Sequence, residues 1–414
     1  MSSTRPIRIV VAGGNYAGLS AIKALYSSLL ASPRSPPAAI PPVEITLIDR
    51  RDGFVHYIGM TRGLTEPEYG AKLWTPYASV PWLQHPQIHI RQATITKITS
   101  TSVQTQRNNN ETADVLFDYL VICLGDGRFA PIGTAATSKA GYLEQIQKAF
   151  EEIRAAGSVA VVGGGAVGIE MAADIKCDFP EKQVKLVHSR QLLLPGPFKD
   201  EFRQTVLDIM QKDIGVDVVL GNRVVSQTPQ SADMLTSNRD PEYISSTVTN
   251  ATLTMANERQ LAADLVIRCL GTKPKYQELV DLPGVFDSTG IRVQDTMQVD
   301  NLNNIYACGD ICSRDQVKLA GVAMYGGYIS GRNIARAVLY GGEAKLENAT
   351  RYPSKIMLLM GKDRFALQMA DEIWDTERAR PYATADMGLD NCIKALALDG
   401  IPAYESLEEA EDSG

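Results

Sequence analysis

Two glycine-rich turns carry the most specific chemistry in this sequence. The first reads Gly13-Gly14-Asn15-Tyr16-Ala17-Gly18, and the second reads Gly163-Gly164-Gly165-Ala166-Val167-Gly168. In such a turn the first glycine allows a tight bend, the second lets the backbone approach a pyrophosphate, and the third lets strand and helix pack closely. The helix that follows offers free N–H groups to the anion. Two copies predict two dinucleotides and a relay of electrons between them.

The two turns differ at their middle position. Gly165 leaves room for a pyrophosphate, whereas Asn15 stands where the second glycine belongs in the first turn. Asn tolerates unusual backbone angles better than most residues, but its side chain reaches toward the place of the phosphates. The second turn is therefore the cleaner dinucleotide signature.

The residues that end the neighbouring strands bear on the ribose of each dinucleotide. Asp49 ends the strand 43–49, where an acidic residue binds ribose hydroxyls, and Arg50 follows it in the same site. The corresponding strand of the second unit ends in His188-Ser189-Arg190 and carries no carboxylate. Arg190 could meet the 2′-phosphate of NADPH or be a solvated loop charge. The preference between NADH and NADPH stays open, with a slight lean toward NADPH or dual use.

Repeated strands must position these turns. A strand is expected at 7–11 and a helix at 17–30, followed by a proline-rich exposed loop. Buried strands that end in Gly125 and Gly271 each follow a glycine turn by roughly a hundred residues. This internal repeat predicts an α/β fold with two Rossmann-like units.

A further motif is Ala307-Cys308-Gly309-Asp310 at the end of a strand. Such a box places a carboxylate and backbone N–H groups at the start of a helix. Asp310 could equally be a simple N-cap.

A helix at 142–156 is expected to link the two units. Residues 354–360 are expected to form an apolar strand, with Met357 and Met360 in the core.

Composition narrows the function classes. The 414 residues are 44% hydrophobic and carry a net charge of −7, which disfavours a sequence-independent nucleic-acid binder. No stretch is long and apolar enough to span a bilayer, and the N-terminus lacks a signal-peptide core, so a cytoplasmic protein is expected. Six scattered cysteines form no disulfide framework, and no metal site is expected.

With five ordered motifs, residues 7–345 resemble the two-dinucleotide flavoproteins of the pyridine nucleotide-disulfide oxidoreductase fold. The resemblance implies FAD at the first turn and NAD(P)H at the second, with Asp310 on the ribityl chain of FAD. It divides the chain into an FAD-binding domain in two parts (1–133 and 272–345), an NAD(P)H-binding domain (134–271) and a small C-terminal α+β domain (346–414).

Within that family the chain looks most like the apoptosis-inducing-factor-like branch, of the AMID or ferroptosis-suppressor type. This resemblance rests on three stretches: Gly-Ile-Glu-Met-Ala-Ala at 168–173, Leu-Val-His-Ser at 186–189 and Lys-Leu-Ala at 318–320. The CxxxxC pair of the disulfide reductases is missing after Asp49, so disulfide reduction is not expected. The lipid anchor of some relatives is also missing, so at most transient membrane contact is expected.

The resemblance implies that Glu170 points toward the nicotinamide–flavin contact and that Lys318 places positive charge near flavin N1 and O2. Each could instead be a surface charge. The favoured function is transfer of hydride from NAD(P)H to FAD and of electrons to a small acceptor, a quinone above all. The alternatives are a flavin-dependent oxidase or dehydrogenase of a specialised metabolite and a redox-sensing flavoprotein that acts by binding partners. The oligomeric state stays open.

Overall fold

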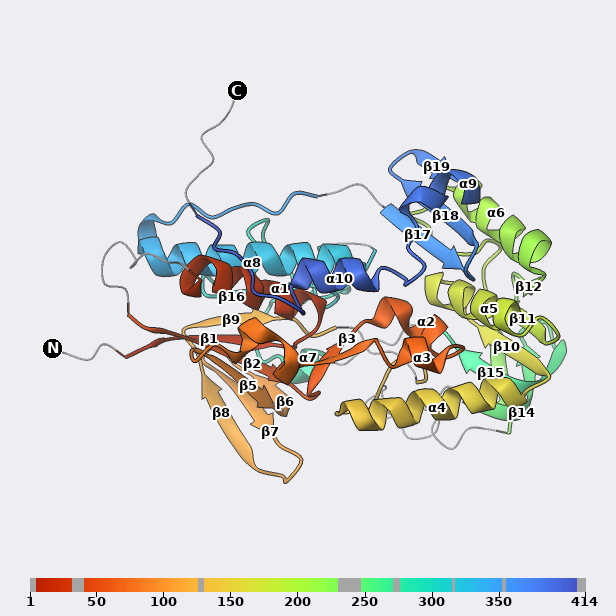
Figure 1. The fold of residues 1–414 in the computed structure, drawn as a ribbon, viewed down its shortest axis with the longest axis horizontal. Coiled ribbons are helices and arrows are strands. Elements are labelled where there is room, and N and C mark those ends of the chain that lie inside the picture. The colour runs from red at the N-terminus through yellow and green to blue at the C-terminus, as the bar shows by residue number, and fades with distance from the viewer. Residues whose placement is uncertain are drawn as a thin grey trace.

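A five-stranded parallel sheet organises one half of the molecule (Figure 1). The computed structural model describes residues 5–31, 41–125, 130–229, 247–270, 276–314, 317–351 and 355–407. The strands of this first sheet, in spatial order, are β16 (Ile305–Ala307), β9 (Tyr119–Ile122), β1 (Ile7–Ala12), β2 (Val43–Asp49) and β5 (Ile88–Gln92). Their near-continuous apolar sequences fit a parallel sheet that is covered on both faces.

Two helices pack side by side on this sheet, α1 (Tyr16–Leu25) and α8 (Ala320–Tyr340) (Figure 1). Their close approach depends on glycine, since a Cβ on Gly327 would lie 2.1 Å from the carbonyl oxygen of Ala17. A Cβ on Gly331 would lie 2.4 Å from the carbonyl oxygen of Ala21. The helix expected at 17–30 is an α-helix as far as Leu25 and continues as a π-helical turn, Tyr26–Leu30.

An antiparallel sheet lies beside the first sheet, with strands β6 (Thr94–Ile98), β7 (Ser102–Gln106) and β8 (Thr112–Leu116). These are the short strands that a polar, alternating sequence favours.

The second half holds a mixed six-stranded sheet. Its strands, in spatial order, are β12 (Asp217–Val219), β11 (Gln183–Val187), β10 (Ser158–Val162), β15 (Gln260–Arg268), β14 (Thr247–Met255) and β13 (Val224–Thr228). The first four are parallel and the last two extend the sheet in antiparallel fashion. In both halves the strand after the glycine turn's helix and the late strand of the repeat flank the first strand. The expected α/β architecture of two Rossmann-like units is confirmed.

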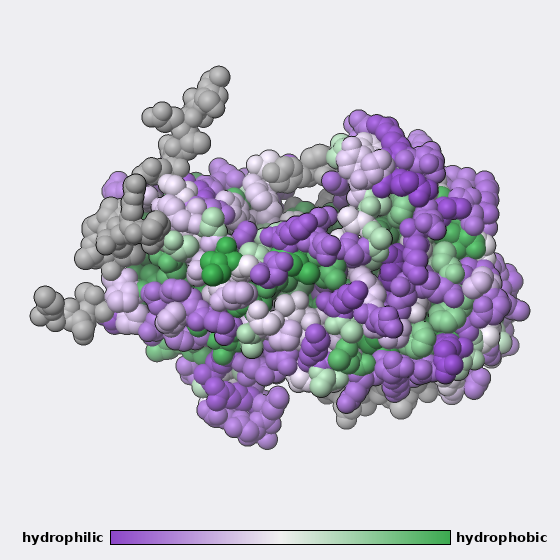
Figure 2. All heavy atoms as spheres, in the orientation of Figure 1, coloured by the Kyte–Doolittle hydropathy of each residue, from purple (hydrophilic) through white to green (hydrophobic). Residues whose placement is uncertain are grey.

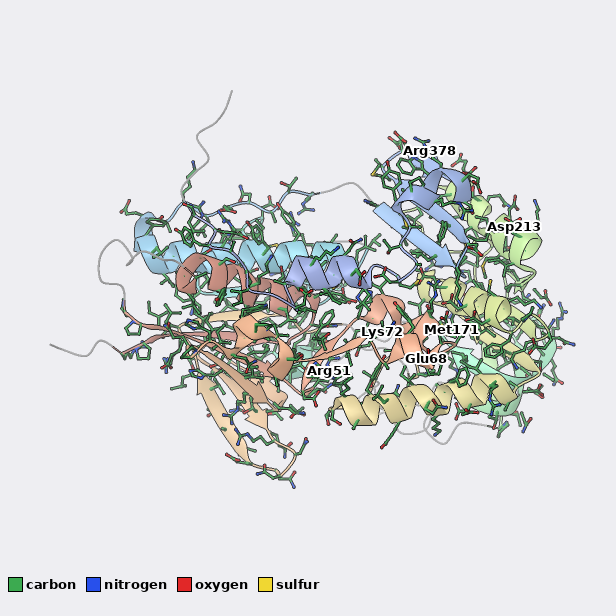
Figure 3. The ribbon with its side chains drawn as sticks, in the orientation of Figure 1. Arg51, Glu68, Lys72, Met171, Asp213 and Arg378 are labelled. Carbon is green, nitrogen blue, oxygen red and sulfur yellow. The ribbon has the colours of Figure 1, made fainter. Side chains whose placement is uncertain are left out.

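Short elements fill the space between the two sheets: β3 (Gly53–Val55), β4 (Trp74–Pro76), α2 (Met60–Gly63), α3 (Pro67–Gly70) and the long helix α4 (Lys139–Ala155). Helix α4 begins three residues earlier than expected because Ser138 caps it, accepting a hydrogen bond from the backbone of Gly141 at 3.3 Å. Met171 of α5 (Ala166–Asp178), labelled in Figure 3, belongs to a core shared with Met60 of α2. One hydrophobic core thus joins the second unit to the connecting elements.

The C-terminal segment contacts both halves. Strands β17 (Lys355–Met360), β18 (Arg364–Met369) and β19 (Glu372–Trp374) form an antiparallel sheet against α5 and α6 (Asp200–Asp208), with α9 (Thr376–Ala379) beside it. Helix α10 (Leu389–Leu396) instead lies beside α1, where Lys23 donates a hydrogen bond to the carbonyl of Ala395 at 3.0 Å (Figure 1). The C-terminal segment therefore packs against both halves of the molecule.

The face shown in Figure 2 is mostly hydrophilic, with hydrophobic residues in small patches between the polar ones. Among the helices of the described residues, none combines the length and the apolar character that a bilayer crossing needs.

Candidate functional site

The first glycine of each turn is required for the same two reasons, its backbone angle and a close backbone contact. Gly13 and Gly163 have φ angles of +104° and +122°, in the region that only glycine enters readily. A Cβ on Gly13 would lie 2.6 Å from the carbonyl oxygen of Cys123, and one on Gly163 would lie 2.5 Å from that of Cys269. Each turn is thus pressed against the late strand of its own unit, and no larger residue fits.

The last glycine of each turn allows strand and helix to meet. A Cβ on Gly18 or on Gly168 would lie 1.8 Å from the carbonyl oxygen of the turn's first glycine. Gly165 differs, because a Cβ there would meet nothing within 4 Å. The open space in front of Gly165 fits the approach of a pyrophosphate to the backbone.

Asn15 is the N-cap of α1 and adopts an extended conformation, with φ −97° and ψ −152°. Its Oδ1 accepts a long hydrogen bond of 3.4 Å from the backbone of Val55. The amide is therefore turned toward β3, and the side chain that replaces the second glycine has a structural partner.

Asp49 is held firmly at the end of β2. Its Oδ2 accepts a hydrogen bond from the backbone of Gly14 at 2.7 Å, and its Oδ1 accepts one from the backbone of Arg51 at 2.8 Å. The Arg51 guanidinium also lies 3.3 Å from Asp49 and donates to the hydroxyl of Tyr57 at 2.7 Å. Burial opposes the charge of Arg51, but the Asp49 carboxylate outweighs it and raises the pKa of Arg51. Figure 3 shows Arg51 near the middle of the molecule, where the two halves meet.

His188 takes the corresponding place in the second unit. Its Nδ1 accepts a hydrogen bond from the backbone of Gly164 at 3.0 Å, which puts the proton of the neutral ring on Nε2. Nε2 is buried and makes no hydrogen bond of ordinary geometry to the described residues, although the backbone of Leu192 acts on its titration. Burial, and then the charges of Arg190 and Arg203, lower the pKa of His188. An imidazole and the exposed Arg190 thus stand after β11, where the first unit has the carboxylate of Asp49 after β2.

One cavity of about 1080 Å³ connects the two units. The predicted site residues that line it are Gly13, Gly14, Asn15, Ala17, Asp49, Arg50, Gly125, Glu170, Gly309, Asp310 and Lys318. Six predicted site residues do not line it: Gly18 in α1, Gly163, Gly165 and Gly168 of the second turn, and His188 and Arg190 after β11. Gly271 falls outside the described residues. The cavity joins the first turn to the start of α5, which follows the second turn.

The Gly309-Asp310 box closes the cavity on the α1 side. Gly309 has φ +83°, and a Cβ on it would lie 3.4 Å from the Cβ of Ala17. Lys318 precedes α8 and donates a hydrogen bond from Nζ to the carbonyl of Cys312. The first residues of the 21-residue helix α8 also line the cavity, so its free N–H groups and positive dipole end face it.

Glu170 lies in the first turns of α5 at the opposite wall. It is buried, and its Oε1 accepts a hydrogen bond of 3.2 Å from the backbone of Leu359 in β17. Burial raises the pKa of Glu170 to about 8, against the effect of this hydrogen bond. Glu170 is therefore a protonated acid at neutral pH and faces the cavity, not the solvent.

Strand β17 supplies part of the same wall. Met360 is in the core as expected. Met357 is half-buried: it packs against the hydrophobic cluster that contains Leu359 and Phe365, and it also lines the cavity, as does its neighbour Ile356. The expectation of a core residue therefore holds only in part for Met357.

The thiol of Cys123, which lines the cavity, lies beside the buried thiol of Cys308. Cys123 and Cys308 follow neighbouring parallel strands, and their Sγ atoms are 3.4 Å apart. Burial raises the pKa of the Cys123 thiol well above its usual range. Since the thiolate is the nucleophile in disulfide exchange, this pair is poorly suited to that chemistry.

Sequence reasoning missed two arginines. The mostly buried Arg51 pairs with Asp49, the buried Arg62 pairs with Asp174, and neither arginine belongs to a motif. Asp174 could have been recognised from the sequence, because it follows Glu170 by four residues in a stretch of strong helix formers and so lies on the same helix face.

Comparison with known proteins places this geometry in a family. Residues 7–327 match the family described as pyridine nucleotide-disulphide oxidoreductase. The oxidoreductase OXR1 of Ajellomyces capsulatus is 31% identical over 431 aligned positions, which cover 97% of this chain and 90% of that protein. Ferroptosis suppressor protein 1 of Xenopus tropicalis is 29% identical over 344 positions, covering 82% of this chain and 83% of the relative. Apoptosis-inducing factor homolog B of Dictyostelium discoideum is 27% identical over 337 positions, covering 79% and 80%.

Solved structures share the fold at lower identity. The water-forming NADH oxidase of Lactobacillus brevis superposes with a TM-score of 0.65 at 20% identity, covering 87% of this chain and 74% of that one. NDH2 of Plasmodium falciparum superposes with a TM-score of 0.66 at 12% identity, covering 96% and 99%.

Proposed function

Because the chain belongs to the pyridine nucleotide-disulphide oxidoreductase family, in its apoptosis-inducing-factor-like branch, we propose that this flavoprotein oxidises NAD(P)H and reduces a quinone. FAD and NAD(P)H are the cofactors of this family. FAD, when bound, takes a hydride from NAD(P)H and passes electrons to the acceptor. The single observation that supports the proposal is the cavity that joins the first glycine turn to the wall formed by Glu170.

The residues of the first unit fit FAD. Gly13 and Gly14 of the first turn line the cavity, and Asp49, held by the backbone of Gly14, stands at the ribose position. Asp310 is assigned to the ribityl chain, and Lys318 with the start of α8 to the pyrimidine side of the flavin ring. Positive charge and helix N–H groups there stabilise added negative charge on the ring.

The residues of the second unit fit NAD(P)H. Gly165 leaves open space for the pyrophosphate, and the exposed Arg190 that follows the strand is a positive charge that could meet a phosphate of the cofactor. The turn leads directly into α5, which carries Glu170 to the cavity. The nicotinamide end of the bound cofactor is thereby directed toward the flavin.

The wall opposite the first turn suits a quinone. Apolar side chains of Ile356 and Met357 line the cavity on β17, the strand whose Leu359 contacts Glu170, and Val317 and Leu319 line it beside Lys318. A quinone needs an apolar slot for its ring and a proton donor for its oxygens, whereas a disulfide substrate needs a reactive thiolate. The buried thiols at Cys123 and Cys308 do not supply one.

The test is an anaerobic absorbance titration of the purified protein with NADH and NADPH in parallel, followed by addition of a water-soluble quinone. The proposal expects the yellow flavin absorbance to disappear with at least one nicotinamide and to return with the quinone. A flavin that stays oxidised with both nicotinamides would contradict the proposal and favour a metabolite that reduces the flavin itself. A flavin that NAD(P)H bleaches but that a quinone does not re-oxidise would contradict only the assignment of a quinone as the acceptor.

A further inference from the structure

Three carboxylates occupy one face of helix α5. Glu170, Asp174 and Asp178 are spaced four residues apart, so their side chains lie one above another along the helix. Glu170 lines the cavity, Asp174 is 1% exposed, and the side chain of Asp178 is 18% exposed. The row runs from the cavity through the protein interior to the surface.

Asp174 is the buried middle member. Its Oδ1 lies 3.5 Å from Nη2 of Arg62, which reaches it from the neighbouring helix α2. Its Oδ2 and the hydroxyl of Thr61 are buried and make no hydrogen bond of ordinary geometry to described residues, although Thr61 lies close enough to lower the pKa of Asp174. The buried Asp174 carboxyl group thus lies between the Arg62 guanidinium and the Thr61 hydroxyl, with its neighbours Glu170 and Asp178 one helical turn away on either side.

Arg62 is fixed independently of Asp174. Its Nη1 donates to the carbonyl of Ala385 at 2.6 Å, and its Nη2 donates to the carbonyl of Gly361 at 2.7 Å. Because these carbonyls hold the guanidinium in place, its positive charge can stabilise the Asp174 carboxylate without a salt bridge that locks both oxygens.

Asp178 meets the solvent at the far end of the row. It lies 3.4 Å from Nζ of Lys362, which is half exposed and also lies 2.9 Å from Glu66. This surface cluster contains groups of both charges in contact with water, from which a proton can enter.

Burial brings the pKa values of the two inner carboxyl groups close to neutral pH. It raises the pKa of Glu170 to about 8, and it raises the pKa of Asp174 despite the opposing charge of Arg62. The titratable and charged groups that face these carboxyls from the surrounding elements are Arg62, Glu66, Tyr69, Cys177, Lys362 and Arg364. The similar proton affinities of the two inner groups permit exchange between them.

We propose that Glu170, Asp174 and Asp178 form a path that delivers protons from the surface at Lys362 to an acceptor in the cavity. This inference rests on the proposed quinone reduction. Two electrons and two protons convert a quinone to a hydroquinone, while NAD(P)H supplies two electrons and one proton. The second proton comes from water: the Glu170 O–H bond breaks as the acceptor O–H bond forms, and Asp174 then returns a proton to Glu170. Asp178 and the solvent restore Asp174.

The decisive comparison uses two electron acceptors. A water-soluble quinone needs the proton, whereas ferricyanide takes an electron and no proton. D174N and D178N interrupt the path, and D174E retains a proton carrier at the same position. E181Q is the matched control, because Glu181 is exposed just beyond the end of α5.

We expect D174N to reduce the quinone at least tenfold more slowly than wild type, most of all at high pH, and D178N to show a smaller loss. Ferricyanide reduction is expected to change less than twofold, and D174E is expected to recover most of the quinone rate. Equal loss with both acceptors, or wild-type quinone rates in both D174N and D178N, would overturn the path.

A second readout does not depend on turnover. The Glu170 carboxyl band, identified in the infrared spectrum by its loss in E170Q, exchanges its proton for deuterium in heavy water. The path predicts slower exchange in D174N than in wild type and E181Q. Unchanged exchange would overturn the inference even if wild-type protein reduced no quinone, so the two proposals fail separately.

Discussion

His188 occupies in the second unit the position that Asp49 occupies in the first. The backbone of Gly164 donates to His188 Nδ1 at 3.0 Å, as the backbone of Gly14 donates to Asp49 Oδ2 at 2.7 Å. The two glycine turns thus share a backbone arrangement but carry side chains of different chemistry at the equivalent position. A carboxylate in the first accepts hydrogen bonds, and a neutral imidazole in the second leaves the site free of negative charge.

This substitution predicts that the protein uses NADPH at least as well as NADH. H188D places a carboxylate where the 2′-phosphate of NADPH would lie, and R190A removes a positive charge beside it. Either change should lower kcat/KM for NADPH by about tenfold, or ~1.4 kcal/mol, with a smaller effect on NADH. Steady-state kinetics with both nicotinamides would check this, with R378A in the distant helix α9 as the control (Figure 3). Equal losses with NADH and NADPH would contradict it.

Alanine substitutions of two glycines in the second turn should have opposite effects on protein stability and on nicotinamide binding. G163A forces a Cβ to within 2.5 Å of a carbonyl oxygen at φ +122°, so it should destabilise the protein by about 2 kcal/mol or more. G165A places its Cβ in open space at φ −81°, so stability should be unchanged while the KM for NAD(P)H rises several-fold. Thermal denaturation and kinetics of both variants separate the two effects. Unaltered nicotinamide affinity in G165A would argue against a pyrophosphate at this turn.

Asp310 is expected to retain FAD. D310A removes the carboxylate assigned to the ribityl chain and should yield protein with much less bound flavin, measured as flavin absorbance relative to protein. D281A is the control, since Asp281 is exposed and pairs with Lys97 at the surface. A D310A protein with the full flavin content of D281A would refute the assignment.

Glu170 gives stability a distinct dependence on pH. An unfolded chain releases the Glu170 proton near its ordinary pKa of 4.5, whereas the folded protein keeps it up to about 8. The wild-type free energy of unfolding should therefore lose this contribution as pH rises from about 4.5 to 8. E170Q removes the effect, so its stability relative to wild type should increase across that range, by at most about 5 kcal/mol. Denaturant unfolding at pH 5 and pH 9 measures the difference, and a constant difference would contradict the buried acid.

The repeated architecture could be predicted because it depends on local signals. Gly13 and Gly163 are required by backbone angle and by a carbonyl at van der Waals distance, and such requirements leave a fixed spacing in the sequence. The strands that follow are buried on both faces and read as continuous apolar runs. The cofactors follow from the same motifs.

The walls of the cavity could not be predicted in this way. Met357 reaches the cavity because β17 packs on α5, a contact between segments far apart in the chain. Arg51 and Arg62 have no motif, and their burial depends on partners that only the folded chain brings near. The return of α10 to α1 is a tertiary contact of the same kind.

The contact between α1 and α8, which Gly327 and Gly331 allow, joins the start of the chain to a segment that is synthesised much later. Strand β16 and helix α8 belong to the layers of the first sheet but leave the ribosome after every strand of the second sheet, whose last strand ends at Arg268. The nascent first half must remain open while the second half emerges and folds. The unit that starts the chain is consequently the last to close, and a chain halted before Ala320 would carry a finished nicotinamide unit beside an unfinished flavin unit.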